Sequence, residues 1–261
     1  MRAPIFQLDS FTTRRFAGNP AAVMPLAAYP PDEILQALAA ENNLSETAFI
    51  VPSGEDFRIR WFTPTVEVPL CGHATLAAAA VVMERLQPDR ALVRFDSASG
   101  PLTVRRAAFG YAMDFPIRRC TPTEAPEALA AAIGPRWIET AFDGFNLLVR
   151  LDSAGEVRAL RPDLAAIARM PFAGVIATAA GDRGYDCVSR YFAPAKGIAE
   201  DPVTGGAHCA LTPFWAERLG KSELRAFQAS ARGGEIRCRL DGERVELGGA
   251  CVFYLEGTAT W

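Results

Sequence analysis

The pentapeptide Arg60-Trp61-Phe62-Thr63-Pro64 decides how this sequence divides, because it returns as Arg190-Tyr191-Phe192-Ala193-Pro194, about half a chain length later. Each copy is followed by a loop, a glycine, a nearby histidine and an alanine-rich helix. These segments are Cys71-Gly72-His73-Ala74 and Gly205-Gly206-Ala207-His208. A strand, a loop and a helix used twice predict two homologous halves that face each other across a cleft.

Short strand-like stretches dominate the chain, and only a few helical stretches interrupt them. The expected strands are residues 5–8, 47–51, 57–62, 92–95, 110–115, 146–151, 174–177, 186–192, 225–229, 236–240 and 250–255. The expected helices are residues 31–41, 73–86, 124–133, 162–168 and 207–219, several of them opened by Pro, Asp or Thr. This order lacks a regular strand–helix alternation, so it predicts an α+β fold.

The junction between the halves is expected between Pro116 and Thr121. Residues 1–117 would form the N-terminal half-domain and residues 118–261 the C-terminal half-domain, with the strand at 250–261 able to pair with the first. Two helix N-termini aimed into one cleft would offer unpaired N–H groups and a partial positive charge. We therefore expect a small anionic metabolite as the partner.

Composition and charge argue against several other functions. The net charge is −3 over 261 residues, without a basic stripe, so a nucleic-acid partner is not expected. No uncharged run exceeds 16 residues, and the one between Glu67 and Glu84 is too short to span a bilayer. No export signal is present, so a cytoplasmic location is expected. The six cysteines lack the spacing of a zinc site, and no nucleotide-binding glycine motif appears.

Only two histidines occur, and both lie in the loop-to-helix segments. At a helix start the macrodipole lowers the pKa of His73, which favours a neutral imidazole near pH 7. Such a ring can donate or accept a hydrogen bond to a substrate. The alternative interpretation is a cap that only satisfies backbone groups.

Two carboxylates are candidates for chemistry. Glu46 lies where polar residues end a helix and an apolar strand begins, so in a closed cleft it could take a proton from carbon and return it elsewhere. In an open position it would simply be solvated. Asp201 begins a turn that leads into Gly205-Gly206; it is either a helix cap or part of a site in which the glycines let a ligand approach backbone N–H groups.

Cysteine chemistry is the other possibility. Cys71 and Cys209 each lie within a few residues of a histidine, as a thiolate nucleophile or a two-thiol racemase would require. A buried, inert thiol is commoner. Arg60 and Arg190 are interpreted as solvated strand charges and receive no role.

Four motifs, in this order, resemble the phenazine-biosynthesis-like (PhzF-type) isomerases, which share their fold with diaminopimelate epimerase. They are Phe16-Ala17-Gly18-Asn19-Pro20-Ala21-Ala22-Val23, Leu44-Ser45-Glu46-Thr47-Ala48-Phe49, Cys71-Gly72-His73-Ala74-Thr75-Leu76 and Glu200-Asp201-Pro202-Val203-Thr204-Gly205. The resemblance spans nearly the whole chain.

The resemblance implies two pseudo-symmetric halves, each a β-barrel-like sheet curled around a central helix, with the active site between them, and a homodimer. It also implies that Glu46 shuttles a proton, that His73 and Asp201 hold and polarise the substrate, and that neither a metal nor an organic cofactor takes part. One departure matters. Well-studied isomerases of the family have a serine, and the epimerases a catalytic cysteine, where this chain has Gly206.

These observations together predict a cofactor-independent isomerase in a biosynthetic process. The substrate carboxylate would lie on backbone N–H groups near Gly72 and Gly206, beside Cys71 and Gly205, while Glu46 moves the proton. Two alternatives remain open at this point. One is a cysteine-dependent racemase or epimerase that uses Cys71, and the other is a non-catalytic metabolite-binding protein that kept the fold.

Overall fold

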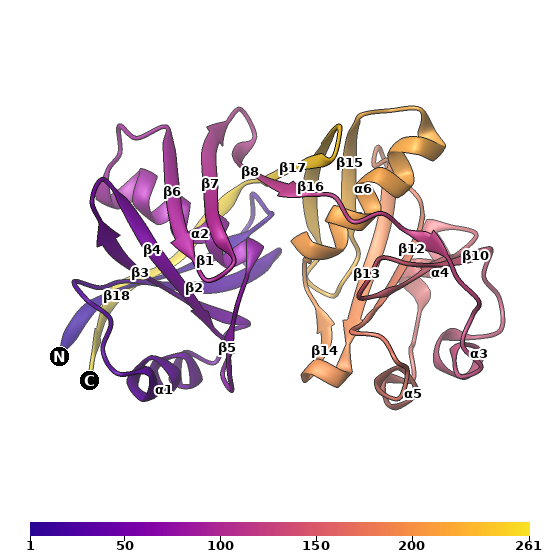
Figure 1. The fold of residues 1–261 in the computed structure, drawn as a ribbon, viewed down its shortest axis with the longest axis horizontal. Helices are drawn as coiled ribbons and strands as arrows, with labels where there is room; N and C mark the ends of the chain where they lie inside the picture. Colours follow the sequence, from indigo (N-terminus) through magenta and orange to yellow (C-terminus); the bar gives the residue numbers. More distant parts are fainter. The chain divides into compact units, whose positions relative to one another are not determined.

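The computed structural model describes residues 1–261, which divide into two compact units. The first unit is Met1–Asp114 together with Gly248–Trp261, and the second is Phe115–Leu247 (Figure 1). The second unit is therefore inserted into the sequence of the first. No helix of the protein is long and apolar enough to cross a membrane.

The first unit is a curled sheet around one buried helix. Helix α2 contacts β1, β2, β3, β7 and β18, and every residue from His73 to Val81 is buried (Figure 1). Small and apolar side chains all round the helix allow this central position. The strands are β1 (Arg2–Ser10), β2 (Asn19–Pro25), β3 (Glu46–Ser53), β4 (Asp56–Phe62), β5 (Glu67–Val68), β6 (Leu92–Ser97), β7 (Gly100–Ala107), β8 (Gly110–Pro116) and β18 (Cys251–Thr260), and the helices are α1 (Asp32–Asn42), α2 (Gly72–Val81) and a π-helical turn at Val82–Leu86.

The second unit has the same plan around helix α6. The helix buries Phe214 and Trp215, and the indole of Trp215 donates to Thr178 of β12 at 3.0 Å. The strands are β9 (Thr121–Pro122), β10 (Glu139–Phe142), β11 (Leu147–Arg150), β12 (Val175–Ala180), β13 (Cys187–Ala193), β14 (Ile198–Asp201), β15 (Glu223–Gln228), β16 (Gly234–Asp241) and β17 (Arg244–Gly249), and the helices are α3 (Leu129–Ile133), α4 (Ala154–Ala159), α5 (Leu164–Ala168), α6 (Gly205–Leu219) and a 3₁₀ turn at Pro194–Lys196.

Strand pairing repeats from one unit to the other. In the first, β3 is parallel to β2 and antiparallel to β4, and β4 is parallel to β6. In the second, β12 is parallel to β11 and antiparallel to β13, and β13 is parallel to β15. The two copies of the pentapeptide thus lie in equivalent strands, β4 and β13. The α+β fold with pseudo-symmetric halves is confirmed, and strand β18 pairs with β1 in the first unit.

Several expected elements differ in extent. The helix expected at 124–133 begins only at Leu129, because Pro126 interrupts the stretch before it and a short irregular segment precedes the helix. The helix expected at 207–219 begins earlier, at Gly205, and the last residues of the one expected at 73–86 form the π-helical turn. Strands β2, β5, β7, β9, β10, β14 and β17 and helix α4 were not among the expected elements.

Candidate functional site

Glu46 is the first residue of β3. Helix α1 ends at Asn42, and the left-handed conformation of the next residue, Asn43 (φ 49°), turns the chain. The Asn42 amide donates to Thr47 Oγ1 at 3.0 Å. In the parallel pairing of β3 with β2, Glu46 lies beside Ala21. The five residues that follow Glu46, Thr47 to Val51, are buried, and its own side chain is only 13% exposed. The carboxylate is thus held at the edge of a packed core.

His73 is the second residue of α2 and contacts Glu46. Its Nε2 lies 3.2 Å from Glu46 Oε2, although the two atoms are not aligned as a hydrogen bond. Burial lowers the pKa of His73 to about 4, and the Pro20 carbonyl opposes this shift. The imidazole is therefore neutral near pH 7, as the sequence predicted, with burial as the main cause.

Cys71 lies on the other side of the same ring. Its Sγ is 3.4 Å from His73 Nδ1, so the imidazole stands between a thiol and a carboxylate with one nitrogen toward each. Potential ligand atoms of Glu46, Cys71 and His73 all lie within 4.8 Å of one another. One histidine nitrogen lies within that distance of both partners, so the three side chains form a possible ligand set. The separate contacts of the two ring nitrogens, one with the thiol and one with the carboxylate, also suit transfer of a proton.

The first of the four family motifs supports this cluster from beneath. It forms the start of β2, and Gly18 (φ +66°) leads into it so tightly that a Cβ there would lie 2.1 Å from the Ser10 carbonyl oxygen. Ser10 Oγ in turn donates to the backbone carbonyl of His73 at 2.9 Å. Ser10, against which Gly18 packs, thereby holds the start of α2.

A second cluster, in the second unit, contains Asp201. Asp201 ends β14, and its Oδ2 accepts a hydrogen bond from Thr204 Oγ1 at 2.5 Å. Gln228, fully buried on β15, donates to the Asp201 carbonyl at 2.7 Å and accepts from the Thr204 backbone N–H at 2.8 Å. The turn before α6 is therefore held by a side chain that sequence reasoning did not select.

Alignment of the two helices at their N-caps, Cys71 and Thr204, identifies equivalent residues. His73 then corresponds to Gly206, and His208 corresponds to Thr75. Thr75 Oγ1 donates to the Cys71 carbonyl at 2.6 Å, and His208 Nδ1 bonds the Thr204 carbonyl at 2.8 Å. The two histidines are thus not equivalent, and His208 has a structural role. Burial lowers its pKa to about 4.

Arg118 also lies at the start of α6. A Cβ on Gly206 would lie 3.8 Å from Arg118 Nη1, and the Arg118 guanidinium lies over the Phe145 ring, 4.6 Å from its centroid. Arg118 lies in the junction segment, far from Gly206 in the sequence. No sequence pattern indicated that the two residues would lie close together.

The arginines of the repeated pentapeptide link neighbouring strands, β4 to β5 and β13 to β14. Arg60 makes two hydrogen bonds to Glu67, both 2.7 Å, and Arg190 makes two to Glu200, at 2.7 and 2.9 Å. The interpretation of these arginines as solvated charges was wrong, because Arg190 is buried and both are paired. Both pairs could have been predicted from the sequence, because an acidic residue, Glu67 or Glu200, follows each copy of the repeated arginine.

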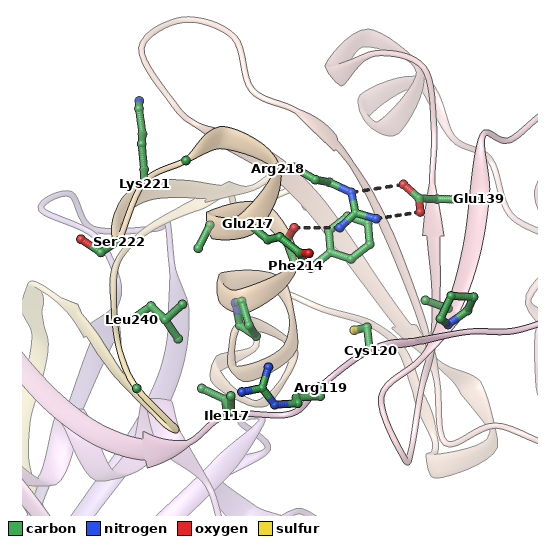
Figure 2. A pocket seen from close by; sticks show the side chains of 16 residues that line it. Ile117, Arg119, Cys120, Glu139, Phe214, Glu217, Arg218, Lys221, Ser222 and Leu240 are labelled. Atoms are coloured by element: carbon green, nitrogen blue, oxygen red, sulfur yellow. Dashed lines mark hydrogen bonds and ion pairs between the residues drawn. The ribbon is translucent and has the colours of Figure 1, made fainter.

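An open groove of about 930 Å³ lies elsewhere in the second unit, beside the C-terminal half of α6 (Figure 2). Arg218 crosses it to Glu139, with Nη2 2.8 Å from Oε2, and Glu139 also accepts from Arg150 at 2.9 Å. None of the residues expected in the site lines this groove. The groove is therefore separate from the candidate site.

The structure thus brings Glu46, Cys71, Gly72 and His73 together in the first unit. Asp201, Gly205 and Gly206 lie together in the second, as their neighbourhood in sequence requires. That one substrate uses both groups stays a prediction.

Comparisons with known proteins agree with the resemblance found in the sequence. Residues 8–257 match the family described as "Phenazine biosynthesis-like protein". An uncharacterized isomerase of Pseudomonas aeruginosa is 50% identical over 257 residues, which cover 98% of each chain. The crystal structure of a PhzF-family phenazine biosynthesis protein from Enterococcus faecalis is 40% identical, with a TM-score of 0.97 over 100% of both chains. A probable proline racemase from Agrobacterium radiobacter, 11% identical, shares the fold alone, with a TM-score of 0.65 over 99% of this chain and 92% of that one.

Proposed function

Since the chain belongs to the phenazine biosynthesis-like family, in which some of its relatives are named isomerases, we propose that it moves a proton on a small carboxylate-bearing substrate, with Glu46 as general acid and base and without a cofactor. The observation that carries this proposal is the contact of the largely buried Glu46 carboxylate with a neutral His73, 3.2 Å apart. Isomerase function in general rests on the family, and the role of Glu46 rests on this geometry.

A neutral imidazole suits a base that must change its charge. A histidinium would form an ion pair with the Glu46 carboxylate, and that pair would be lost whenever the carboxylate took up a proton. The neutral ring of His73 can instead donate from Nε2 to the carboxylate or accept from the carboxylic acid. Glu46 can therefore be stabilised in both protonation states of a catalytic cycle.

The proton balance of the proposed reaction is simple. Glu46 takes a proton from a substrate carbon and becomes a carboxylic acid, and the electron pair of the broken C–H bond spreads into the neighbouring unsaturated group. The acid then returns the proton to a different carbon, which leaves an isomer and an ionised Glu46. By the family resemblance, His73 and Asp201 hold and polarise the substrate during this shift.

The test is deuterium uptake from D₂O into a pool of amino-acid-like and hydroxy-carboxylate metabolites, read by mass spectrometry. The protein should label one compound, and Glu46→Gln should lower the labelling rate by roughly 10² to 10⁴, the usual contribution of a general base. Glu41→Gln, an exposed change at the end of α1, is the matched control and should label normally. Full labelling by Glu46→Gln would remove Glu46 from the mechanism.

A cysteine-dependent racemase is the second candidate, favoured by the 3.4 Å contact between Cys71 Sγ and His73 Nδ1. It predicts that Cys71→Ser and alkylation of Cys71 both abolish turnover. Under the Glu46 proposal, Cys71→Ser keeps most of its activity, because the hydroxyl can occupy the same place beside the ring. Retention of a compound without any labelling would instead favour a non-catalytic binding protein.

A further inference from the structure

We propose that Arg118 is the specificity residue that selects a substrate carboxylate, taking it at the start of α6 beside Gly206. This inference rests on the proposed function and adds to it the group that recognises the anion. The proposal is based on the Arg118 guanidinium, which contacts Phe145 and has no counter-ion.

Arg118 is held by contacts of both its backbone and its side chain. Its backbone N–H donates to the Cys209 carbonyl at 2.9 Å, which ties the junction segment to α6. Its guanidinium carbon lies over the Phe145 ring, 4.6 Å from the centroid, in a cation–π contact. The backbone N–H of Phe145 is held in turn by Asp143 Oδ1 at 2.8 Å. The guanidinium is therefore pre-organised.

The Arg118 guanidinium has no ion pair and no side-chain hydrogen bond, whereas Arg158 and Arg190 of the second unit are paired. Arg190 pairs with Glu200 at 2.7 Å and Arg158 with Asp182 at 2.7 Å. The acidic group of the same turn, Asp143, accepts hydrogen bonds from the backbone N–H groups of Phe145 and Asn146. A half-buried arginine without a counter-ion can bind an incoming anion without first breaking a salt bridge.

Gly206 has no side chain that could cover the Arg118 guanidinium. A Cβ at Gly206 would come within 3.8 Å of Arg118 Nη1, so any side chain there would contact the guanidinium. The N-cap Thr204 does not cap α6, because its hydroxyl donates to Asp201. The N–H groups of the first turn of α6 thus have no side-chain cap, and Arg118 lies beside this turn. The forked, planar guanidinium matches a carboxylate.

Tyr191 is a neutral group near Arg118 and Asp201. Tyr191 lies opposite Asp201 in the β13–β14 pairing, and its hydroxyl donates to Asn146 Oδ1 at 3.0 Å. Burial, with Asp201 and Asp143 adding to it, raises the pKa of Tyr191 to about 12, while Arg118 opposes the shift. The phenol stays neutral, so Arg118 is the positive group that an anion would meet here.

The experiment measures binding of three small carboxylates, benzoate, propionate and succinate, each against its amide, by isothermal titration. The protein carries Glu46→Gln so that no turnover occurs. At least one carboxylate should bind more than about tenfold tighter than its amide, and Arg118→Gln should remove that preference without changing amide binding. Arg118→Lys should keep part of it, because the charge remains but the fork is lost.

Arg119→Gln is the matched control. Arg119 is the next residue, exposed and paired with Glu243, so its loss should leave the preference unchanged. Absence of any carboxylate preference in the parent protein, or an undiminished preference in a folded Arg118→Gln variant, would overturn the proposal. Deuterium labelling tests Glu46 separately, so failure of one assignment can be told from failure of the other.

Discussion

Gly174 occupies, in the second unit, the position that Glu46 occupies in the first. Arg60 pairs with Phe49 and Arg190 with Ala177, and Glu46 and Gly174 each lie three residues before those partners. A Cβ at Gly174 would lie 2.6 Å from the Tyr191 hydroxyl oxygen and 2.8 Å from the Phe192 carbonyl oxygen. The duplicated fold therefore has room for the glutamate in one half only.

Gly174→Ala should destabilise the protein by about 2 kcal/mol, because the methyl group meets a backbone oxygen that cannot move away easily. Equilibrium urea unfolding measures the change. Gly155→Ala, in helix α4 with its nearest neighbour 3.7 Å away, is the control and should be neutral or slightly stabilising. Equal stabilities for the two variants would contradict the packing described here.

Stability should fall as the pH drops from about 6.5 toward 4. The fold lowers the pKa of His73 and His208 to about 4, below the unfolded value of 6.5. The stabilisation is complete above pH 6.5, where the histidines are neutral in both states. It is lost as the pH falls from 6.5 to 4, because in that range the unfolded chain binds protons and the folded chain does not. Each histidine should contribute about 2 kcal/mol of this loss between pH 7 and pH 5.

Urea unfolding of His73→Gln and His208→Gln at those two pH values checks the pH dependence. Each single variant should remove about half of the slope. A slope unchanged in both would mean that the histidines are not buried as neutral groups.

Gln228→Leu should weaken substrate binding more than it slows chemistry, because Gln228 acts through the Asp201–Thr204 turn and not on Glu46. We expect KM to rise about tenfold and the protein to lose about 2 kcal/mol of stability, since the Thr204 N–H loses its acceptor. Gln36→Leu removes a comparable bond, 2.9 Å to the Thr63 carbonyl, and should leave KM unchanged. A fall in kcat alone would assign Gln228 a different role.

The two Arg–Glu pairs should differ in energetic weight. Arg190 is 10% exposed and also donates to the Leu160 carbonyl, so Glu200→Gln leaves a buried charge poorly compensated and should cost about 3 kcal/mol. Glu67→Gln, at the equivalent but more exposed pair, should cost less than about 1 kcal/mol. Thermal unfolding of the two single variants provides the comparison, and a reversed order would refute it.

Local sequence signals accounted for much of the fold and for one side of the candidate site. The pentapeptide repeat located equivalent strands, and the two loop-to-helix segments located the starts of α2 and α6. Glu46 and His73 were selected because each lies at a boundary between elements, where residue type and position can be read along the chain. Their contact agrees with that selection, while their catalytic roles remain proposals.

What the sequence did not reveal depends on distant partners. Gln228 and Arg118 reach the start of α6 from other segments, and no periodicity predicts which side chain will cross to a given turn. The helix expected at 124–133 was too long for a local reason: alanine and glutamate favour a helix, but Pro126 interrupts the stretch, and only Leu129–Ile133 is helical.

The insertion of the second unit into the first imposes an order on synthesis. A ribosome completes all residues of Phe115–Leu247 before it makes β18, the strand that pairs with β1 along nine positions of the first unit. The continuous unit can close its sheet while the discontinuous one still exposes the edge of β1. Nascent chains of this protein should therefore first become protease-resistant in their middle, and the flanking segment that carries Glu46 should become resistant last.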